Sequence, residues 1–310
     1  MEKTLQTEIF WGYDNDEKSV ARTKLNMFLV GDGHIHIYDN DSLVDWNNEI
    51  EYKEDEFDYI LTNPPIGSYE GEAKITDFDF TNEKRYELMF LEKVVKATKP
   101  GVGEIAIIIN DGSLESPSRK GFREKLLKNC NINAIISLTK FAFAPYTKEK
   151  TYLLFLQKKE RNQELKEFKN VEDDIQKFPI WHFILDYDGF ANSDKRYRTK
   201  YHDDIPELEE KFDGALKVAR SYLTDIDSFK SKRSEYERAV NPREIEEGLR
   251  GMKYGFVEMS EINESNFFNL LSEFHLRPHE TKQITEIEFE QKVSKIEDEI
   301  SDLIKVGDNK

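Results

Sequence analysis

The fold is decided by one stretch, FDYILTNPP at residues 57–65. Its first six residues predict a β-strand, because branched and aromatic side chains cluster there. The two prolines that follow cannot donate hydrogen bonds to a sheet ladder, and they hold the backbone extended. The strand must therefore end at Asn63, which leaves an amide side chain and a stiff row of carbonyl groups at its carboxyl end. In open α/β sheets, this edge is where ligands bind.

A rigid amide beside rigid carbonyl groups suits one chemical task. It can accept both hydrogens of an exocyclic amino group and leave the amino nitrogen free to react. Asn63, followed by Pro64 and Pro65, is therefore a candidate for presenting an amine to an electrophile. The alternative for an isolated tripeptide is an Asn-Pro turn that ends an ordinary strand, so the interpretation depends on the surrounding sequence.

Strand-like and helix-like segments alternate through residues 1–158. The expected strands lie at 7–13, 34–38, 57–61, 104–109, 134–138 and 151–156, and the expected helices at 18–29, 85–98 and 121–129. The run at 104–109 is almost wholly apolar, as a central strand covered on both faces would be. This alternation predicts an α/β fold with a doubly wound, mostly parallel sheet.

The composition changes beyond Lys158. A charged and polar stretch at 159–178 is followed by an expected strand at 178–185, a turn at 186–190 and a long charged helix at 206–247. We therefore expect a first domain at 1–158, a C-terminal α+β or helical region at 159–283 and an amphipathic tail helix at 284–310.

The tail carries an apolar stripe at a/d heptad spacing, made of Phe289, Val293, Ile296, Ile300 and Leu303. Such a stripe predicts a helix that packs on its own domain or binds a partner, and the sequence leaves both open.

The composition also limits the classes of function. The chain has 310 residues, 35% of them charged, and a formal net charge of −17. Non-specific affinity for DNA comes largely from Lys and Arg on phosphates, so any DNA contact should be local or shared with a more basic partner. The single cysteine, Cys130, excludes an internal disulfide and is typical of a small buried apolar residue. Without a signal peptide or a membrane-length apolar run, we expect a cytoplasmic protein with no membrane contact.

Acidic or amide side chains follow three expected strands in succession. Asp14 follows the first strand, Asp41 the second and Asn63 the third. In nucleotide-binding sheets, a carboxylate at the end of one strand commonly accepts hydrogen bonds from ribose hydroxyl groups. One strand further along, a carboxylate can accept from an adenine amino group. Each position alone is weak evidence, because turns after strands favour Asp and Asn for capping, but the three in this order favour a nucleotide site.

Several short motifs occur in order along residues 8–200. They are GYDND at 12–16, NM at 26–27, DSL at 41–43, FDYILTNPP at 57–65, FLE at 90–92, KPG at 99–101, IIINDG at 107–112, FAFAPY at 141–146, KT at 150–151 and, more weakly, DGF at 188–190 with KR at 195–196. In this order they resemble the motifs of the modification (M) subunit of type I restriction-modification systems, which belongs to the N6-adenine DNA methyltransferases. The Asn-Pro-Pro context is the specific part of the resemblance, and the other motifs support it by their order.

The resemblance implies a Rossmann-like methyltransferase fold, with residues 1–158 as a partial catalytic domain and S-adenosylmethionine as the cofactor. The implied cofactor contacts are Asp14 at the ribose and Asp41 at the adenine, with Ser42 and Asn63 beside them.

The resemblance also implies the substrate and the catalytic residues. An adenine flipped out of double-stranded DNA would be methylated at N6, in a catalytic group made of Asn63, Pro64, Pro65 and Ile66. The Asn63 side-chain oxygen and the Pro64 carbonyl would accept the two N6 hydrogens. The implied partners are DNA, a specificity (S) subunit and a restriction (R) subunit.

Two features depart from the family pattern. The position after Pro-Pro is usually aromatic and stacks on the flipped base, whereas here it is Ile66. Stacking is worth about 1–3 kcal/mol per base, and the candidates to replace it are Tyr69, Phe78, Phe80 and Phe143. Family members also carry a first strand with a glycine-rich turn, and an N-terminal helical domain, before the part matched here. We therefore expect this chain to be a fragment of a longer methyltransferase.

Other readings of the same residues stay open. An Asn-Pro-Pro site can also present the side-chain amide of a protein glutamine, and a remnant without the glycine-rich turn could keep the fold as an inactive interaction module. His34 and His36 project to one face of a strand, but no third metal ligand is spaced near them, so we expect no metal. Basic clusters at 119–123, 148–150 and 195–198 are either phosphate contacts or solvated helix ends and turns.

Overall fold

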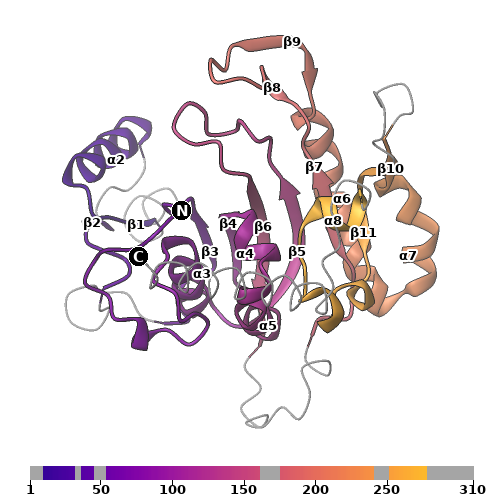
Figure 1. Cartoon of the computed structure of the whole chain (residues 1–310), viewed down its shortest axis with the longest axis horizontal. Helices are drawn as coiled ribbons and strands as arrows, with labels where there is room; N and C mark the ends of the chain where they lie inside the picture. Colours follow the sequence, from indigo (N-terminus) through magenta and orange to yellow (C-terminus); the bar gives the residue numbers. More distant parts are fainter. Residues whose placement is uncertain (1–9, 32–35, 45–53, 161–174, 241–250, 278–310) are drawn as a thin grey trace, which may run out of the picture.

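The computed structural model of the chain describes residues 10–31, 36–44, 54–160, 175–240 and 251–277. Within these ranges, helices pack on both faces of a large β-sheet, and two smaller sheets lie beside it (Figure 1). The predicted tail helix at 284–310 lies outside the described residues, and so does His34.

Seven strands form the main sheet, in the order β10-β11-β7-β5-β6-β4-β3 (Figure 1). Their bounds in chain order are β3 Tyr59–Thr62, β4 Glu104–Asn110, β5 Cys130–Ser137, β6 Thr151–Lys158, β7 Ile180–Ile184, β10 Arg238–Ala239 and β11 Met252–Val257. The pairings orient β3, β4, β5, β7 and β10 in one direction and β6 and β11 in the other. The predicted α/β fold with a mostly parallel sheet is confirmed.

A two-stranded sheet lies on the β3 side of the main sheet (Figure 1). It pairs β1, Trp11–Asp14, with β2, His36–Asp39, in parallel, and the two strands are connected by the helix α2, Glu17–Val30. The helix begins after Asp16, whose side chain accepts a backbone N–H of the first turn, and it ends at Gly31, where a φ of 82° suits glycine. The unit is therefore a βαβ motif with capped helix ends, as the sequence pattern predicts.

Helices cover both faces of the main sheet, as the doubly wound prediction requires. One face carries α3 Tyr86–Ala97, α4 Asp111–Glu115, α5 Lys120–Asn129 and α8 Ser272–Leu276, and the other carries α6 Ile205–Thr224 and α7 Ile226–Lys232. Alternate side chains of each strand enter opposite cores; in β7, Ile180 and Ile184 enter the first core, and Trp181 and Phe183 enter the second. None of the described helices is both long enough and apolar enough to cross a membrane.

Beyond residue 185 the structure differs from the sequence prediction. The expected turn at 186–190 opens a hairpin of β8, Asp188–Phe190, and β9, Arg198–Asp203. The expected helix at 206–247 ends at Thr224, because Asp225 leaves helical geometry and caps α7 by accepting the Ser228 N–H at 2.9 Å. β11 was not expected, since a glycine inside it weakens the strand pattern.

Cys130 is buried at the start of β5, as predicted. The main sheet takes strands from both sides of Lys158, and the division of the chain into domains near this residue stays a prediction.

The outer edge of β3 is only partly covered by the described residues. β3 pairs only with β4 among the described strands, and its Tyr59 and Leu61 side chains are 71% and 80% exposed. A cavity of about 420 Å³ adjoins them, with Ala106, Phe212 and Leu216 in its wall. An apolar strand face is therefore open to solvent at this end of the sheet.

His182 is fully buried in β7. Its Nδ1 lies 2.9 Å from the Ser272 hydroxyl oxygen, and its Nε2 meets no hydrogen-bond partner among the described residues. His275 packs beside it, with ring centroids 5.8 Å apart. Burial first, and then the charge of His275, lower the pKa of His182 well below its ordinary value.

Acidification is therefore expected to destabilise the fold. Below a pH of about 6.5, His182 is protonated in the unfolded chain but stays neutral in the folded protein. Protonation therefore stabilises the unfolded chain, and the free energy of unfolding falls as the pH falls. We predict that His182→Asn loses less stability than wild type between about pH 7.5 and about pH 5.5, measured by urea unfolding. Ser272→Ala removes the same hydrogen bond but keeps the titrating ring, so it should retain the wild-type pH dependence. Equal pH dependence in His182→Asn and wild type would contradict this account.

Candidate functional site

Four chain segments meet at the carboxyl edge of the main sheet. The register sets Asn110 of β4 beside Thr151 of β6, and Ser137 of β5 beside Tyr152. β3 is parallel to β4 and ends at Thr62, which pairs with Ile107, three residues before the end of β4. β7 is parallel to β5 and leads into the β8–β9 hairpin, at the top in Figure 1. The turns after β3, β4, β5 and β7 therefore share one edge.

Asn63 stands at this edge directly after β3. It is exposed, and its side chain forms no hydrogen bond with any described residue. Pro64 is buried, Pro65 is exposed and Ile66 is half-buried. The buried ring fixes the backbone while the amide beside it stays open to a ligand, so the four predicted catalytic residues lie where a ligand can reach them.

A buried carboxylate holds the far end of the loop that carries Asn63. The Gly67 N–H donates to Glu87 Oε2 at 2.9 Å, and the Tyr86 N–H donates to the Gly67 carbonyl at 2.9 Å. Glu87 is fully buried in the first turn of α3, where it also accepts from Arg85 Nε at 2.6 Å. Gly67 has a φ of 124°, which L side chains rarely adopt. Sequence reasoning missed Glu87, because an acid in the first turn of a helix is common for electrostatic reasons alone.

The predicted cofactor residues lie on the small sheet. Asp14 ends β1 and is exposed, and its Oδ1 accepts the Asp16 N–H at 2.8 Å. Asp41 follows β2 beside the half-buried Ser42, and its carboxylate accepts from one backbone N–H at 2.8 Å and from the Tyr69 hydroxyl at 2.9 Å. Because β1 and β2 run parallel, Asp14 and Asp41 lie at the same end of this sheet.

Tyr69 links the small sheet to the Asn63 loop. Its hydroxyl donates to Asp41 and accepts the Ala73 N–H at 3.1 Å, while its backbone N–H donates to the Lys84 carbonyl at 2.9 Å. Burial, reinforced by Asp41 and opposed by the Ala73 N–H, raises the pKa of Tyr69 to about 12. The hydroxyl therefore stays protonated near neutral pH, and it holds the Asp41 carboxylate in place.

The candidates for the missing aromatic residue differ in exposure. Tyr69 and Phe78 are only 4% and 7% exposed and belong to the same small hydrophobic core. Phe80 and Phe143 are half-buried. Tyr146, which sequence reasoning did not single out for this role, is 94% exposed on the loop between β5 and β6. Tyr146 is therefore the most exposed aromatic residue at the carboxyl edge among the described residues, ahead of Tyr197 in the β8–β9 hairpin at 65%.

The basic clusters are largely engaged inside the protein. Arg123 is fully buried and donates to the backbone carbonyls of Phe267 and Phe268. Other members form ion pairs, namely Arg119–Glu83, Lys120–Glu264, Lys148–Asp194, Lys150–Glu273 and Arg196–Asp188. These contacts give the clusters a structural role, in keeping with the acidic net charge.

No metal centre is apparent in the part of the chain that the structure describes, since no cluster of His, Cys, Asp or Glu there could hold an ion. His36, one of the two histidines noted in the sequence, stacks on Trp11 with ring centroids 4.0 Å apart.

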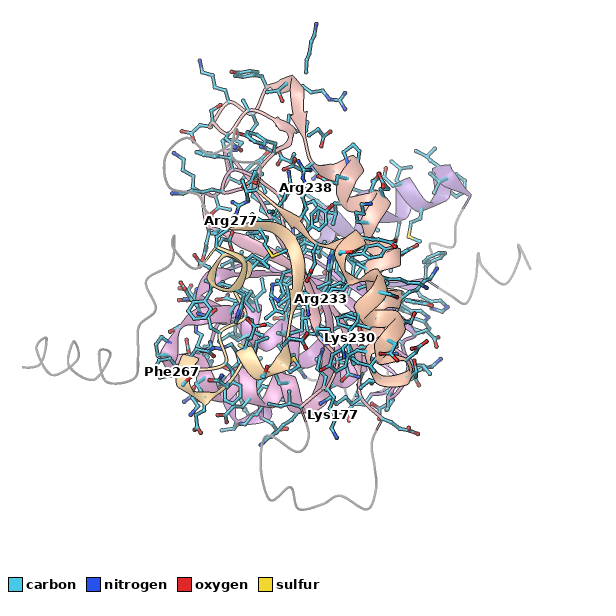
Figure 2. All side chains as sticks on the ribbon, turned by 90° about the vertical axis from the view of Figure 1, so that its right-hand side faces the viewer. Lys177, Lys230, Arg233, Arg238, Phe267 and Arg277 are labelled. Atoms are coloured by element: carbon cyan, nitrogen blue, oxygen red, sulfur yellow. The ribbon has the colours of Figure 1, made fainter. Side chains whose placement is uncertain are left out.

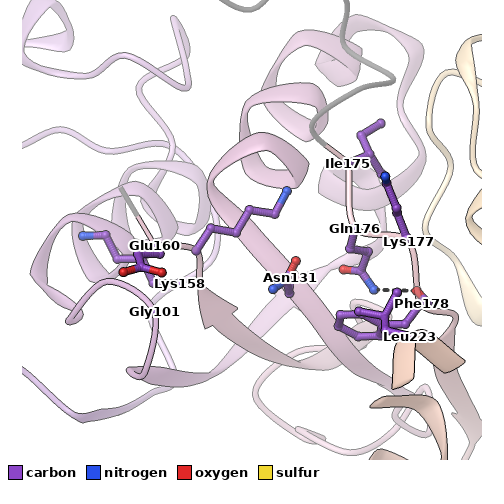
Figure 3. A pocket seen from close by; sticks show the side chains of 10 residues that line it. Gly101, Asn131, Lys158, Glu160, Ile175, Gln176, Lys177, Phe178 and Leu223 are labelled. Carbon is purple, nitrogen blue, oxygen red and sulfur yellow. Dashed lines mark hydrogen bonds between the residues drawn. The ribbon is translucent and has the colours of Figure 1, made fainter. Parts of the chain in front are cut away.

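A second cavity, of about 320 Å³, opens at the amino edge of the main sheet (Figure 3). It is lined by three lysines, but two of them are already bound: Lys158 pairs with Asp55, and Lys159 donates to the Leu127 carbonyl at 2.7 Å. The cavity lies at the opposite edge from Asn63, so it is not part of the candidate site.

The carboxyl-edge groups fit two ligands of complementary chemistry. Asn63 and Pro64 present oxygens that accept from an amine, which suits a base with an exocyclic amino group. The carboxylate of Asp14 keeps one oxygen unbound among the described contacts, and each oxygen of Asp41 can accept a second hydrogen bond. These acceptors fit the hydroxyl and amino groups of a nucleoside.

Comparison with known proteins identifies the family of the chain. The model of the N-6 DNA Methylase family matches residues 1–229. The methylase subunit of the type I restriction enzyme EcoEI from Escherichia coli is 26% identical over 211 residues, which cover 67% of this chain and 39% of that protein.

Solved structures share the fold. One of them comes from work on complex assembly and conformational transition of the type I R-M system. It has a TM-score of 0.58 at 19% identity, and the match covers 98% of this chain and 56% of that chain. The modification subunit of a putative type I restriction enzyme from Vibrio vulnificus YJ016 has a TM-score of 0.57 at 21% identity, over 93% of this chain and 50% of that chain. This chain thus spans 39% to 56% of the length of these relatives.

Replacing Glu87 should release the Asn63 loop. Glu87→Ala leaves the Gly67 N–H without its acceptor and Arg85 without its partner, so we expect a loss of about 2–4 kcal/mol in the free energy of unfolding. Glu83→Ala removes an acid whose side chain is 35% exposed and which pairs with Arg119 in the same region, and should cost less, about 1 kcal/mol, because water can reach the carboxylate. Equal losses in the two variants, measured by urea unfolding, would show that Glu87 is not the anchor.

Proposed function

Because the chain belongs to the N-6 DNA methylase family, we propose that it forms part of a type I restriction-modification methyltransferase. The proposed reaction transfers a methyl group from S-adenosylmethionine to N6 of an adenine flipped out of DNA. The main support is the exposed Asn63 amide at the end of β3, which is held between a buried proline and the Glu87–Gly67 anchor. Since the chain spans about half the length of its relatives, the proposal concerns the assembled enzyme.

In this proposal, Asn63 and Pro64 bind the target amine. The Asn63 side-chain oxygen and the Pro64 carbonyl each accept one N6 hydrogen. This weakens the delocalisation of the nitrogen lone pair into the ring and aims the lone pair at the methyl donor. Because Pro64 is buried and Pro65 fixes its own φ, the Pro64 carbonyl and the backbone that carries Asn63 are held before the base arrives, so the barrier falls through positioning and electrostatics.

Asp14, Asp41 and Ser42 are proposed to hold the cofactor, whose sulfonium supplies the activated methyl group. Asp14 accepts from the ribose hydroxyl groups, and Asp41 accepts from the adenine amino group. Asp41 is oriented for this by the Tyr69 hydroxyl, which also ties it to the loop after Asn63. The Tyr69 side chain thereby links the residues that bind the cofactor to the residues that bind the target amine.

Recognition of DNA is proposed to need other subunits. The chain carries a net charge of −17, and five basic side chains of its clusters are paired with acids. A more basic specificity subunit would supply phosphate contacts and read the sequence, and a restriction subunit would complete the system.

Asn63→Ala should remove the amine acceptor without disturbing the core, because the side chain is exposed. In the assembled enzyme we expect a fall of about 100-fold or more in methyl incorporation into DNA from labelled S-adenosylmethionine, the size seen when one preorganised polar group is deleted from an active site. Asn129→Ala, at the exposed end of α5, is the matched control and should keep wild-type activity. Unchanged methylation in Asn63→Ala would contradict the proposed function.

Asp14→Ala should weaken cofactor binding. Hydrogen bonds to a charged group contribute about 1.5–3 kcal/mol, so calorimetric titration should show a dissociation constant for S-adenosylmethionine raised by about 10- to 100-fold. Asp16→Ala removes a neighbouring exposed carboxylate that caps α2, so it should lower stability slightly and leave binding unchanged. Wild-type affinity in Asp14→Ala would exclude the ribose contact.

A further inference from the structure

A segment at residues 259–277 crosses one face of the main sheet and reaches its carboxyl edge. Figure 2 shows Phe267 at the lower end of this face and Arg277 at the upper end. The segment lies beyond residues 1–229, which the family model matches. Two of its charged side chains, Glu273 and Arg277, contact the parts of the chain that flank the candidate site.

Glu273 joins the two ends of the loop between β5 and β6, hereafter loop 138–150. Its Oε1 accepts from Ser137 Oγ at 2.5 Å and pairs with Lys150 Nζ at 3.0 Å, and its Oε2 accepts from the Tyr152 hydroxyl at 2.7 Å. Ser137 immediately precedes the loop and Lys150 ends it. A single carboxylate on α8 therefore fixes both ends.

Further bonds close the base of loop 138–150 around this carboxylate. Lys150 Nζ donates to the Leu138 carbonyl at 2.6 Å, and the Leu138 N–H donates to the Thr151 carbonyl at 3.0 Å. Burial alone would raise the pKa of Glu273, but Lys150 and the two hydroxyl donors outweigh it and lower that pKa. The carboxylate is therefore ionised near neutral pH, which keeps Lys150 in place.

Arg277 fixes the root of the β8–β9 hairpin in the same way. Its two terminal nitrogens donate to the Asp186 carboxylate at 2.9 and 2.8 Å, in the bidentate geometry typical of strong pairs. The hairpin in turn contacts loop 138–150, because Thr139 Oγ1 donates to Asp188 at 3.1 Å and Lys148 pairs with Asp194 at 2.9 Å. Loop and hairpin are thus both held by the segment at residues 259–277.

The segment that carries Glu273 is itself rigidly anchored. Phe267 and Phe268 have φ values of 56° and 52°, a left-handed conformation that is strained for residues with a side chain. The buried Arg123 of α5 donates to both of their carbonyl groups, at 2.6 to 3.0 Å. The strain persists because the guanidinium holds both peptide groups, so the position of α8 is fixed relative to the sheet.

We propose that Glu273 is a positioning residue for methyl transfer, which sets loop 138–150 so that the exposed Tyr146 contacts the target base beside Asn63. The role at the base rests on the proposed function, whereas the anchoring of the loop does not. Tyr146 supplies the aromatic surface that Ile66 lacks, and stacking is effective only if the ring is held in one place. Glu273 acts through the loop and does not touch the substrate.

The anchoring is tested by hydrogen–deuterium exchange in the full chain. Glu273→Gln keeps the shape of the side chain but removes its charge, so exchange in loop 138–150 should rise about tenfold, as expected for losing a charge-assisted contact, while β4 and β7 stay unchanged. Glu264→Gln is the matched control, because this residue of the same segment is exposed and pairs with Lys120 at the surface; it should leave the loop unchanged. If Glu273→Gln does not fold, Lys150→Gln removes the other partner and should loosen the same loop.

Unchanged exchange in loop 138–150, or a rise spread evenly over the sheet, would overturn the inference, since the second result is what a general packing role gives. In the assembled enzyme, Glu273→Gln should lower kcat for DNA methylation about tenfold without changing the affinity for S-adenosylmethionine, as should Tyr146→Ala. The two effects should be less than additive when combined. An unchanged kcat in Glu273→Gln would also overturn the inference.

Asn63→Ala separates the two proposals. It should lower methylation about 100-fold or more and leave exchange in loop 138–150 at the wild-type rate. If methylation survives in Asn63→Ala, the proposed function fails. If the loop is unaffected in Glu273→Gln while Asn63→Ala is inactive, only the role of Glu273 fails.

Discussion

Two successive prolines cannot continue a sheet ladder, and the layout of the carboxyl edge follows from that constraint. β3 stops at Thr62, so the chain must turn there, and the turn is secured by the buried ring of Pro64 and by the bond from Gly67 to Glu87. The Asn63 amide is left without a hydrogen bond to any of the residues that the structure describes. An exposed amide that the described contacts do not use, on a backbone fixed by its neighbours, is available for a ligand, and this supports the proposed role of the position.

The candidate site is assembled from two separate sheets. Asp14 and Asp41 belong to the small parallel pair, whereas Asn63 belongs to the seven-stranded sheet. Tyr69 connects them through its bond to Asp41 and its place in the loop after Asn63. Among the described residues, the distance from Asp14 and Asp41 to Asn63 therefore depends on side-chain contacts and not on hydrogen bonds between paired strands.

The sequence predicts those parts of the fold whose cause is local. The helices α2, α3 and α5 and the strands β2 to β6 follow from periodicity within short windows, and the mostly parallel sheet follows from their alternation. The helix break at Asp225 and the strand β11 escape this reasoning. Glu87 and Glu273 escape it as well, because they act on partners 20 and 136 residues away, and no local pattern distinguishes such a carboxylate from a surface one. The roles of Asp14, Asp41 and Asn63 stay predictions.

The open side of β3 has a practical consequence for work with the isolated chain. On its outer side β3 has no neighbouring strand among the described residues, so its peptide groups, next to the exposed Tyr59 and Leu61, are able to pair with a second strand that reaches them. Concentrated preparations of this polypeptide will therefore tend to self-associate through that side. Oligomers seen at high concentration will then reflect adhesion between uncovered strands and not the subunit arrangement of the working complex.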